Sequence, residues 1–196
     1  MCAMFAACKQ WLVRSANRFR SSKHFALCRK GTTAIEFALI AAPFLALLVA
    51  LFETALVFFA ERVLDEVTEE GSRYILTGQA QQANMTQAQF QNYLCTGANT
   101  AALVSALFNC SNLMVNVDNY SDFASASTST PTLTYNANGT VSNTWNYSPG
   151  TPGSIVVVQV MYQWPIILGP LAFNLSNLSN GDRLLISTAV FKSEPY

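Results

Sequence analysis

Charged side chains are scarce in this sequence, and histidine is nearly missing. Only 11% of the 196 residues are Asp, Glu, Lys or Arg, whereas about a quarter of a typical soluble domain is charged. The single histidine, His24, lies in a basic N-terminal stretch, so the remainder has none for a catalytic triad, a zinc site or a proton relay. It also has no glycine-rich phosphate loop. We therefore expect no enzyme, no catalytic residue, no cofactor and no metal site.

Acidic residues are missing from the first 31 positions. This leader holds seven of the eleven basic residues, which are Lys9, Arg14, Arg18, Arg20, Lys23, Arg29 and Lys30. The remaining positions carry 11 − 7 = 4 bases and 11 acids, a net charge of 4 − 11 = −7. A basic N-terminus can bind nucleic acid. Because an apolar run follows directly, we interpret it as a positive-inside topology signal, and we expect no nucleic-acid partner.

One apolar run is too long for a globular core. It covers residues 34–60 and is interrupted only by Glu36, Glu53 and Thr54. A helix crosses the hydrocarbon of a bilayer with about 20 residues, while a cleaved secretory signal has an apolar core of about 7–15. We therefore predict a retained transmembrane helix over residues 32–60, with the leader (residues 1–31) in the cytoplasm and the later residues outside it.

The cysteines divide in agreement with that topology. Cys2, Cys8 and Cys28 lie in the leader, where thiols stay reduced, and Cys95 and Cys110 lie in the exported part. Two cysteines in an oxidising compartment are the smallest set that can pair, which predicts a disulfide. The alternative is two unpaired buried cysteines.

The helical pattern continues beyond the apolar run. Its apolar positions recur every three or four residues, while charged residues take the positions between them. We predict one helix over residues 33–76 that ends near Gly78, with residues 61–80 as an amphipathic extension. A second helix is predicted to begin at Thr86, capped together with Gln89. A short third helical segment is expected over residues 101–108.

From Asn112 the period changes to two, which is typical of strands. Strands are predicted from residue 112 and over 154–164 and 183–192. The polar segment 120–153 is either an exposed hairpin, with its turn at 136–139, or a mobile loop. The predicted fold class is α+β: a long N-terminal transmembrane helix continues into an amphipathic helix that packs on a small antiparallel β-sheet, within an extracytoplasmic domain of residues 81–196.

The two acids in the apolar run need an explanation, because a carboxylate in a membrane span is costly. Taken alone, Glu36 at the start of the run is an interfacial charge close enough to water to be tolerated. Glu53 is either a neutral glutamate hydrogen-bonded within its own helix, or an intramembrane contact that finds a polar partner in another membrane component.

The region around Glu36 resembles a known arrangement. A basic leader, Gly31, four uncharged residues, Glu36 and a long apolar helix resemble the type IV prepilin family. Within it, the chain resembles the TadE-like proteins, which are minor pilins or pseudopilins of tight-adherence (Flp-type IV) pili. The segments that carry this resemblance are Thr33-Ala34-Ile35-Glu36-Phe37-Ala38-Leu39, Pro43, Glu70-Gly71-Ser72-Arg73-Tyr74 and the tail Phe191-Lys192-Ser193-Glu194-Pro195-Tyr196. Thr32 departs from the Phe of many type IV pilins.

The resemblance implies a function in pilus assembly. It implies cleavage between Gly31 and Thr32 by a prepilin peptidase, after which Glu36 can neutralise the new Thr32 amine of a neighbouring subunit. It also implies the bacterial inner membrane as location, a periplasmic domain, and partners among other minor pilins and the inner-membrane platform. The alternatives are an unprocessed single-pass membrane protein with a ligand- or partner-binding domain, and a membrane-tethered hydrolase, which the missing histidine disfavours.

Overall fold

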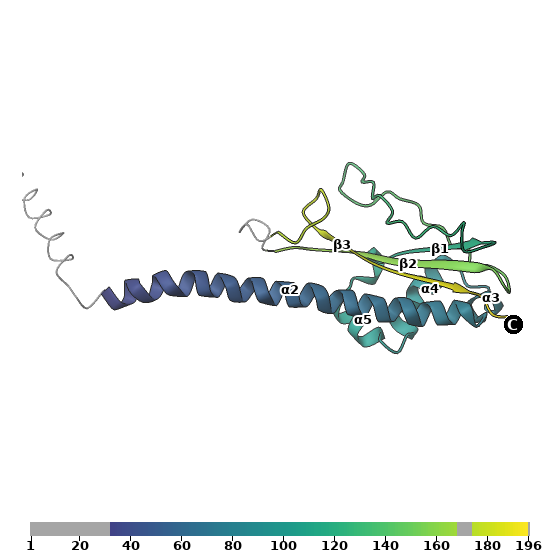
Figure 1. Cartoon of the computed structure of the whole chain (residues 1–196), viewed down its shortest axis with the longest axis horizontal. Helices are drawn as coiled ribbons and strands as arrows, with labels where there is room; N and C mark the ends of the chain where they lie inside the picture. Colours follow the sequence, from purple (N-terminus) through teal and green to yellow (C-terminus); the bar gives the residue numbers. More distant parts are fainter. Residues whose placement is uncertain (1–31, 168–173, 196) are drawn as a thin grey trace, which may run out of the picture. The chain divides into compact units, whose positions relative to one another are not determined.

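The computed structural model describes residues 32–167 and 174–195 (Figure 1). The chain divides into two compact units, Met1–Val49 and Ala50–Tyr196. The described part of the first unit is the beginning of helix α2. The second unit contains the rest of α2, several short helices and a three-stranded sheet. The α+β class predicted from the sequence is therefore confirmed.

Helix α2, Thr32–Leu76, is a single α-helix of 45 residues that contains Pro43 without ending there. This confirms the continuous helix predicted for residues 33–76. It is long and apolar enough to cross a membrane. Gly78 follows its end with a φ of 76°, a left-handed conformation that glycine adopts easily and that terminates helices.

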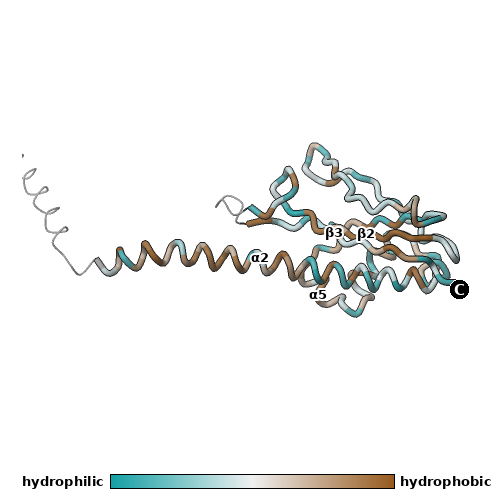
Figure 2. Tube along the Cα trace, in the orientation of Figure 1, coloured by the Kyte–Doolittle hydropathy of each residue, from teal (hydrophilic) through white to brown (hydrophobic). Residues whose placement is uncertain are grey.

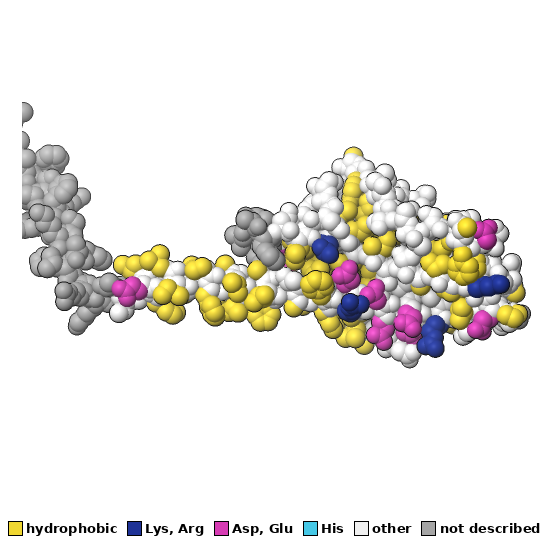
Figure 3. Space-filling model, in the orientation of Figure 1, with side chains coloured by type: hydrophobic (Ala, Val, Ile, Leu, Met, Phe, Trp, Pro, Cys, Tyr) yellow, Lys and Arg dark blue, Asp and Glu magenta, His cyan; other side chains and the backbone are white. Residues whose placement is uncertain are grey.

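The first part of α2, residues 32–49 in the first unit, and its second part, residues 50–76 in the second unit, differ in what surrounds their side chains. Along the first part the large apolar side chains are exposed, for instance Phe37 at 74% and Phe44 at 58%. The second part buries a stripe at intervals of three or four residues, consisting of Val57, Ala60, Val63, Leu64, Val67 and Ile75. Hydrophobic colour covers the first part in Figure 2, while charged side chains gather over the second unit in Figure 3. The predicted amphipathic extension is therefore present.

Short helices follow α2. They are α3 (Gln79–Gln82), α4 (Gln87–Asn92), the π-helical turn η2 (Tyr93–Gly97), α5 (Ala101–Leu107) and the 3₁₀ turn η3 (Cys110–Asn112). The cap predicted for the second helix is confirmed, because the Thr86 hydroxyl accepts from the Gln89 N–H and the Gln89 carboxamide accepts from the Thr86 N–H. Such reciprocal caps satisfy N–H groups that a helix start otherwise leaves unpaired.

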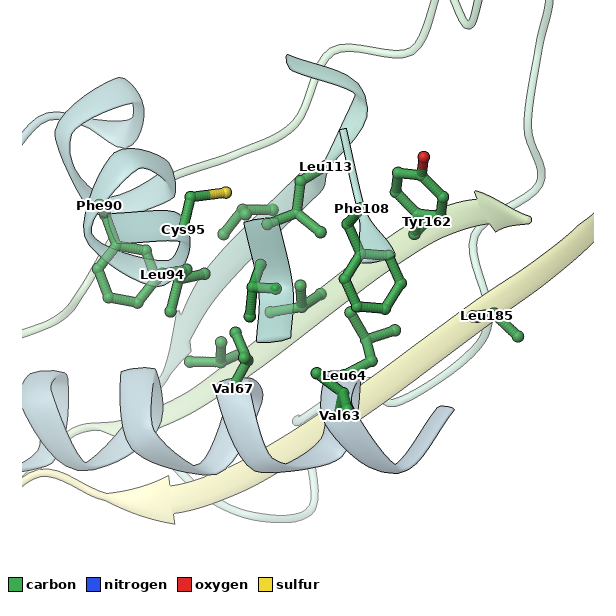
Figure 4. Close-up of a cluster of buried hydrophobic side chains, with 14 of the residues drawn as sticks. Val63, Leu64, Val67, Phe90, Leu94, Cys95, Phe108, Leu113, Tyr162 and Leu185 are labelled. Atoms are coloured by element: carbon green, nitrogen blue, oxygen red, sulfur yellow. The ribbon is translucent and has the colours of Figure 1, made fainter. Parts of the chain in front are cut away.

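The sheet consists of β1 (Met114–Tyr120), β2 (Ile155–Trp164) and β3 (Arg183–Lys192), antiparallel and in that order. Val115 and Val117 lie opposite Val160 and Val158 and face the helices. These strands, α2 and the short helices together enclose one core, part of which is drawn in Figure 4. The central strand β2 is buried on both faces over residues 155–162.

The polar segment 120–153 covers the other face of the sheet. It contains a turn in which the Gly139 N–H donates to the Asn136 carbonyl, an isolated bridge between Tyr135 and Val141, and another between Tyr147 and Val117 of β1. Its apolar side chains Leu133, Val141 and Trp145 pack on Met114, Met161 and Leu184 of the three strands. The turn at 136–139 agrees with the hairpin signal, but the segment is a cover for a second small core as well as an exposed hairpin.

The two edges of the sheet are protected differently. On the β1 side, Gln87 Nε2 donates to Val115 O and Gln91 Nε2 donates to Leu113 O, just before β1, both at 2.8 Å. The Val117 N–H donates to the Asn146 carbonyl, and the Val117 carbonyl accepts from the Ser148 N–H. On β3, Leu184 is bonded at its N–H and carbonyl by the Asn177 side chain. Farther along β3, no partner is found within the described part of the chain for the outward backbone groups of residues 186, 188 and 190.

Candidate functional site

The predicted cleavage site lies at the beginning of the described structure. Gly31 lies outside the described residues, as does the basic leader, and Thr32 is the first residue of α2. Glu36 lies one turn farther on, in α2, and its side chain is exposed. The apolar side chains around it, such as Ile35 at 64% and Ile40 at 71%, are exposed too. A carboxylate on such a surface is accessible to another chain, which is what the predicted pairing with a neighbouring amine requires.

Glu53 lies in the second unit and is only 8% exposed. Its Oε1 accepts a hydrogen bond from the backbone N–H of Ile167 at 2.6 Å. Ile167 belongs to the connection between β2 and β3, so this partner is 114 positions away in the sequence and not on α2. A carboxylate that accepts hydrogen bonds can be buried at lower cost. The predicted contact of Glu53 with another membrane component stays a prediction.

Cys95 and Cys110 are joined by a disulfide in the structure, with their Cα atoms 6.0 Å apart. The bond connects η2 to η3 and closes a loop that contains α5. Cys95 is buried in the main core beside Leu94 and Phe90. The disulfide therefore fixes the layer of short helices that covers the second part of α2.

The segment Glu70-Gly71-Ser72-Arg73-Tyr74 holds that layer against α2. The Glu70 carboxylate accepts from the Asn99 backbone N–H at 2.8 and 2.9 Å and from its side-chain amide at 2.6 Å. A Cβ at Gly71 would lie 2.5 Å from Leu94 Cδ2, so only glycine permits this approach. Tyr74 packs on Tyr93 with ring centroids 4.3 Å apart. The segment is thus a docking surface for α4, η2 and the turn at Asn99.

The tail returns to the end of α2. The Glu194 N–H donates to the Leu76 carbonyl at 3.0 Å, and the Ser193 N–H donates to the Ser154 carbonyl at 2.9 Å. The last carbonyls of a helix have no partner within the helix. The segment after β3 therefore caps α2 and ties it to the start of β2.

Burial perturbs two tyrosines of the second unit. Burial raises the pKa of Tyr147 to about 12, with a smaller contribution from Tyr74. Burial also raises the pKa of Tyr93, and the nearby charge of Glu70 adds to this. Both rings lie near the Phe90 ring of α4, Tyr93 from η2 and Tyr147 from the polar segment 120–153. Their pKa values stay above neutral pH, so neither is poised to exchange protons near pH 7.

Several hollows open on the second unit. One, of about 410 Å³, lies between α2 and β3 and is lined in part by Asp65, Glu69, Ser72 and Thr188. Another, of about 540 Å³, is lined in part by Gln91, Asn112, Trp145 and Gln163. Within residues 32–167 and 174–195, no cluster of His, Cys, Asp and Glu could hold a metal ion.

A long apolar helix that continues into a small α+β domain is the build of a single-pass membrane protein. Residues 31–73 match the model of the TadE-like protein family, which confirms the resemblance recognised in the sequence. No match was found among curated proteins or among solved structures. The matched segment begins at Gly31 and includes Glu36, Glu53 and Glu70. The family indicates a part in the assembly of tight-adherence pili.

Sequence reasoning missed the groups that connect α2 to distant segments. These are Ile167, which donates to Glu53, and Asn99, which donates to Glu70. Neither residue belongs to a motif, and a sequence does not indicate which backbone N–H will donate to a distant side chain. The one available signal was the Pro165-Ile166-Ile167 run, which places apolar residues in a connection between strands, where polar residues are usual.

Proposed function

We propose that this protein is a minor pilin or pseudopilin of a tight-adherence (Flp-type IV) pilus, cleaved after Gly31 by a prepilin peptidase. It is anchored in the bacterial inner membrane by α2, with its α+β domain in the periplasm, and its role is structural rather than catalytic. Its proposed partners are the peptidase, other minor pilins and the inner-membrane platform.

One observation carries this proposal: the family match joins the predicted cleavage site to the apolar helix that carries Glu36. The TadE-like match covers residues 31–73, which include Gly31, Glu36 and most of α2. Cleavage between Gly31 and Thr32 would leave an N-terminal amine at the first residue of an exposed apolar helix. Glu36 would then lie about 6 Å along the helix axis from that amine, at 1.5 Å per residue. In a low-dielectric environment an amine of a neighbouring chain is a strongly favoured partner for such a carboxylate.

Mass spectrometry of the protein from cells that contain the peptidase tests the cleavage. We expect a mature chain that begins at Thr32, and an intact leader in Gly31→Leu, since a bulky side chain at the bond hinders access. Ser22→Leu is the matched control, because it adds the same side chain within the leader, nine residues away, and should be processed normally. An intact leader in the unmodified protein would refute the proposal.

The role of Glu36 is tested separately from cleavage. Glu36→Gln keeps the size of the side chain and removes its charge, so we expect normal processing at Thr32 but loss of pilus assembly. Glu66→Gln is the control, because it neutralises another exposed acid of α2 in the second unit. Normal assembly in Glu36→Gln would support the interfacial reading of this charge instead.

The hollow lined by Gln91, Trp145 and Gln163 favours a second candidate function. Amide and indole groups around a cavity of about 540 Å³ are suited to a small polar ligand. On this reading the protein is an unprocessed single-pass membrane protein with a binding domain. The mass of the leader region decides between the two, since only the first candidate function requires cleavage.

A further inference from the structure

The connection after β2 exposes apolar side chains. After Trp164 the chain continues with Pro165, Ile166 and Ile167. Ile167 is 81% exposed, more than Phe37 on the apolar part of α2 at 74%. A single exposed isoleucine needs no explanation, but one that lies beside other exposed apolar side chains suggests contact with something apolar.

The structure holds Ile167 against α2. The Ile167 N–H donates to Glu53, whose carboxylate is nearly buried. On α2, Phe52 at 69% and Leu56 at 51% are exposed within one turn of Glu53. Apolar side chains from two distant parts of the sequence are thus brought to the same level of the helix.

That level lies within the predicted transmembrane helix of residues 32–60, about one hydrocarbon thickness from its start. Residues 33–52 are 20 residues of helix, or about 30 Å at 1.5 Å per residue, which equals the hydrocarbon thickness. Glu53 is therefore the first residue of α2 beyond the hydrocarbon when the span begins at Thr33. Buried acids and exposed apolar side chains can both be accommodated at this depth, because the interface is neither fully wet nor fully apolar.

We propose that residues 165–167 form a membrane-contact site that inserts Ile167 into the outer interface of the bilayer that α2 spans, while Ile166 packs against the main core. The occupant of this apolar surface is lipid, because the surface is continuous with the exposed apolar side chains of α2. Glu53 is a positioning residue that fixes the depth of the loop through the Ile167 N–H. The proposal rests on the membrane anchoring proposed above.

Spin-label depth measurements test it on the full chain in nanodiscs of phosphatidylcholine and phosphatidylglycerol, one copy per disc. Cys2, Cys8 and Cys28 are replaced by Ser, and a nitroxide is attached at Ile167→Cys. We expect relaxation by oxygen, which concentrates in lipid, and protection from a water-soluble nickel chelate. Leu45→Cys on the apolar part of α2 is the lipid-exposed reference. Thr188→Cys, on the exposed edge of the sheet, is the water-exposed reference.

The outcomes separate this proposal from the anchoring on which it rests. If the label at Ile167→Cys is as accessible to the nickel chelate as the label at Thr188→Cys, while the label at Leu45→Cys lies in lipid, the proposed contact site is wrong. The proposed membrane anchoring by α2 is then still supported. If Leu45→Cys is also open to the nickel chelate, the anchor and the contact site both fail. If neither reagent reaches the label at position 167, protein rather than lipid covers this residue, which also overturns the proposal.

A variant of the positioning residue sharpens the test. Glu53→Gln retains an oxygen that can accept from the Ile167 N–H, and Glu53→Leu does not. In the Glu53→Leu background we expect the label at 167 to shift toward the nickel accessibility of Thr188→Cys, while Leu45→Cys stays unchanged. In Glu53→Gln the label should stay near its original depth. Equal depths in both backgrounds would mean that Glu53 does not position the loop.

Discussion

The two parts of α2 are one unbroken helix in two environments. The first part exposes its phenylalanines and leucines on all sides, and the second buries one stripe against a sheet and a layer of short helices. Composition separates the two parts, because residues 34–60 carry two charged side chains and residues 61–76 carry seven. The spacing of the charges adds which face is buried, because Glu61, Arg62, Asp65 and Glu66 leave the core positions free. Periodicity therefore identifies the face of a helix that packs on a protein core.

The largest contrast is expected from the same substitution in each part. Leu64→Ala removes a side chain that is 1% exposed and leaves a cavity, so we expect a loss of about 2–5 kcal/mol in unfolding free energy. Leu45→Ala, at a position 56% exposed, should change the stability of the second unit by less than about 0.5 kcal/mol. Denaturant unfolding in detergent, followed by tryptophan fluorescence, measures both. Equal losses would contradict the division of α2.

The disulfide tests whether the short helices act as the cover of the second part. Replacing Cys95 and Cys110 together by Ser opens a loop of 15 residues, which corresponds to about 3 kcal/mol in chain entropy. Cys28→Ser in the leader is the control and should have no effect on the second unit. A double variant that unfolds at the same denaturant concentration as the original protein would show that the cover is held by packing alone.

Gly71 tests how closely the cover approaches the helix. Gly71→Ala places a Cβ 2.5 Å from Leu94 Cδ2 and 3.1 Å from Phe90 Cζ. Overpacking of this kind costs about 1–3 kcal/mol, and the higher helix propensity of alanine offsets about 1 kcal/mol. We expect a net loss that shrinks when Leu94→Ala is introduced, which a double-mutant cycle measures. Additive losses would mean that the two residues are not in contact.

The smallest effect is expected from Tyr147 at high pH. Its pKa is raised from 10.0 to about 12, mainly by burial. The neutral phenol is therefore favoured in the folded state, and the associated stability is present below pH 10 and lost as the pH rises toward 12. Because the side chain is half-buried, the loss should stay below about 1 kcal/mol. This loss is measured by comparing the unfolding free energies of Tyr147→Phe and the original protein at pH 9 and 11. If both proteins lose the same stability between these pH values, the prediction is wrong.

The elements that the sequence predicted are those with local signals. Helix α2, the reciprocal cap of Thr86 and Gln89, and strand β2 all follow from spacing within a few residues. Val156, Val158 and Val160 of β2 lie in the main core with the helices.

The other features depend on contacts between distant segments. The alternation of side chains along a strand suggests that Gln159 faces solvent. It is buried instead, because segment 120–153 crosses above it and the Ser129 carbonyl accepts from its side chain. The same holds for Glu53 and Glu70, whose partners lie 114 and 29 positions away. Of the candidate site, the chemistry of each acid could be anticipated from the sequence, but its partner could not.

The unequal edges of the sheet bear on how the exported unit behaves in solution. On the β1 side, Val115 accepts from a glutamine side chain and Val117 pairs with backbone groups of residues 146 and 148. The outward groups of residues 186, 188 and 190 in β3 have no partner within the described ranges. An open strand edge is a template on which another chain can add a strand, and proteins limit this with charges near the strand. Arg183 and Lys192 at the two ends of β3 are such charges. We therefore expect aggregation of an overproduced protein to begin at this edge, and a lysine at Thr188 to be the substitution that best preserves solubility.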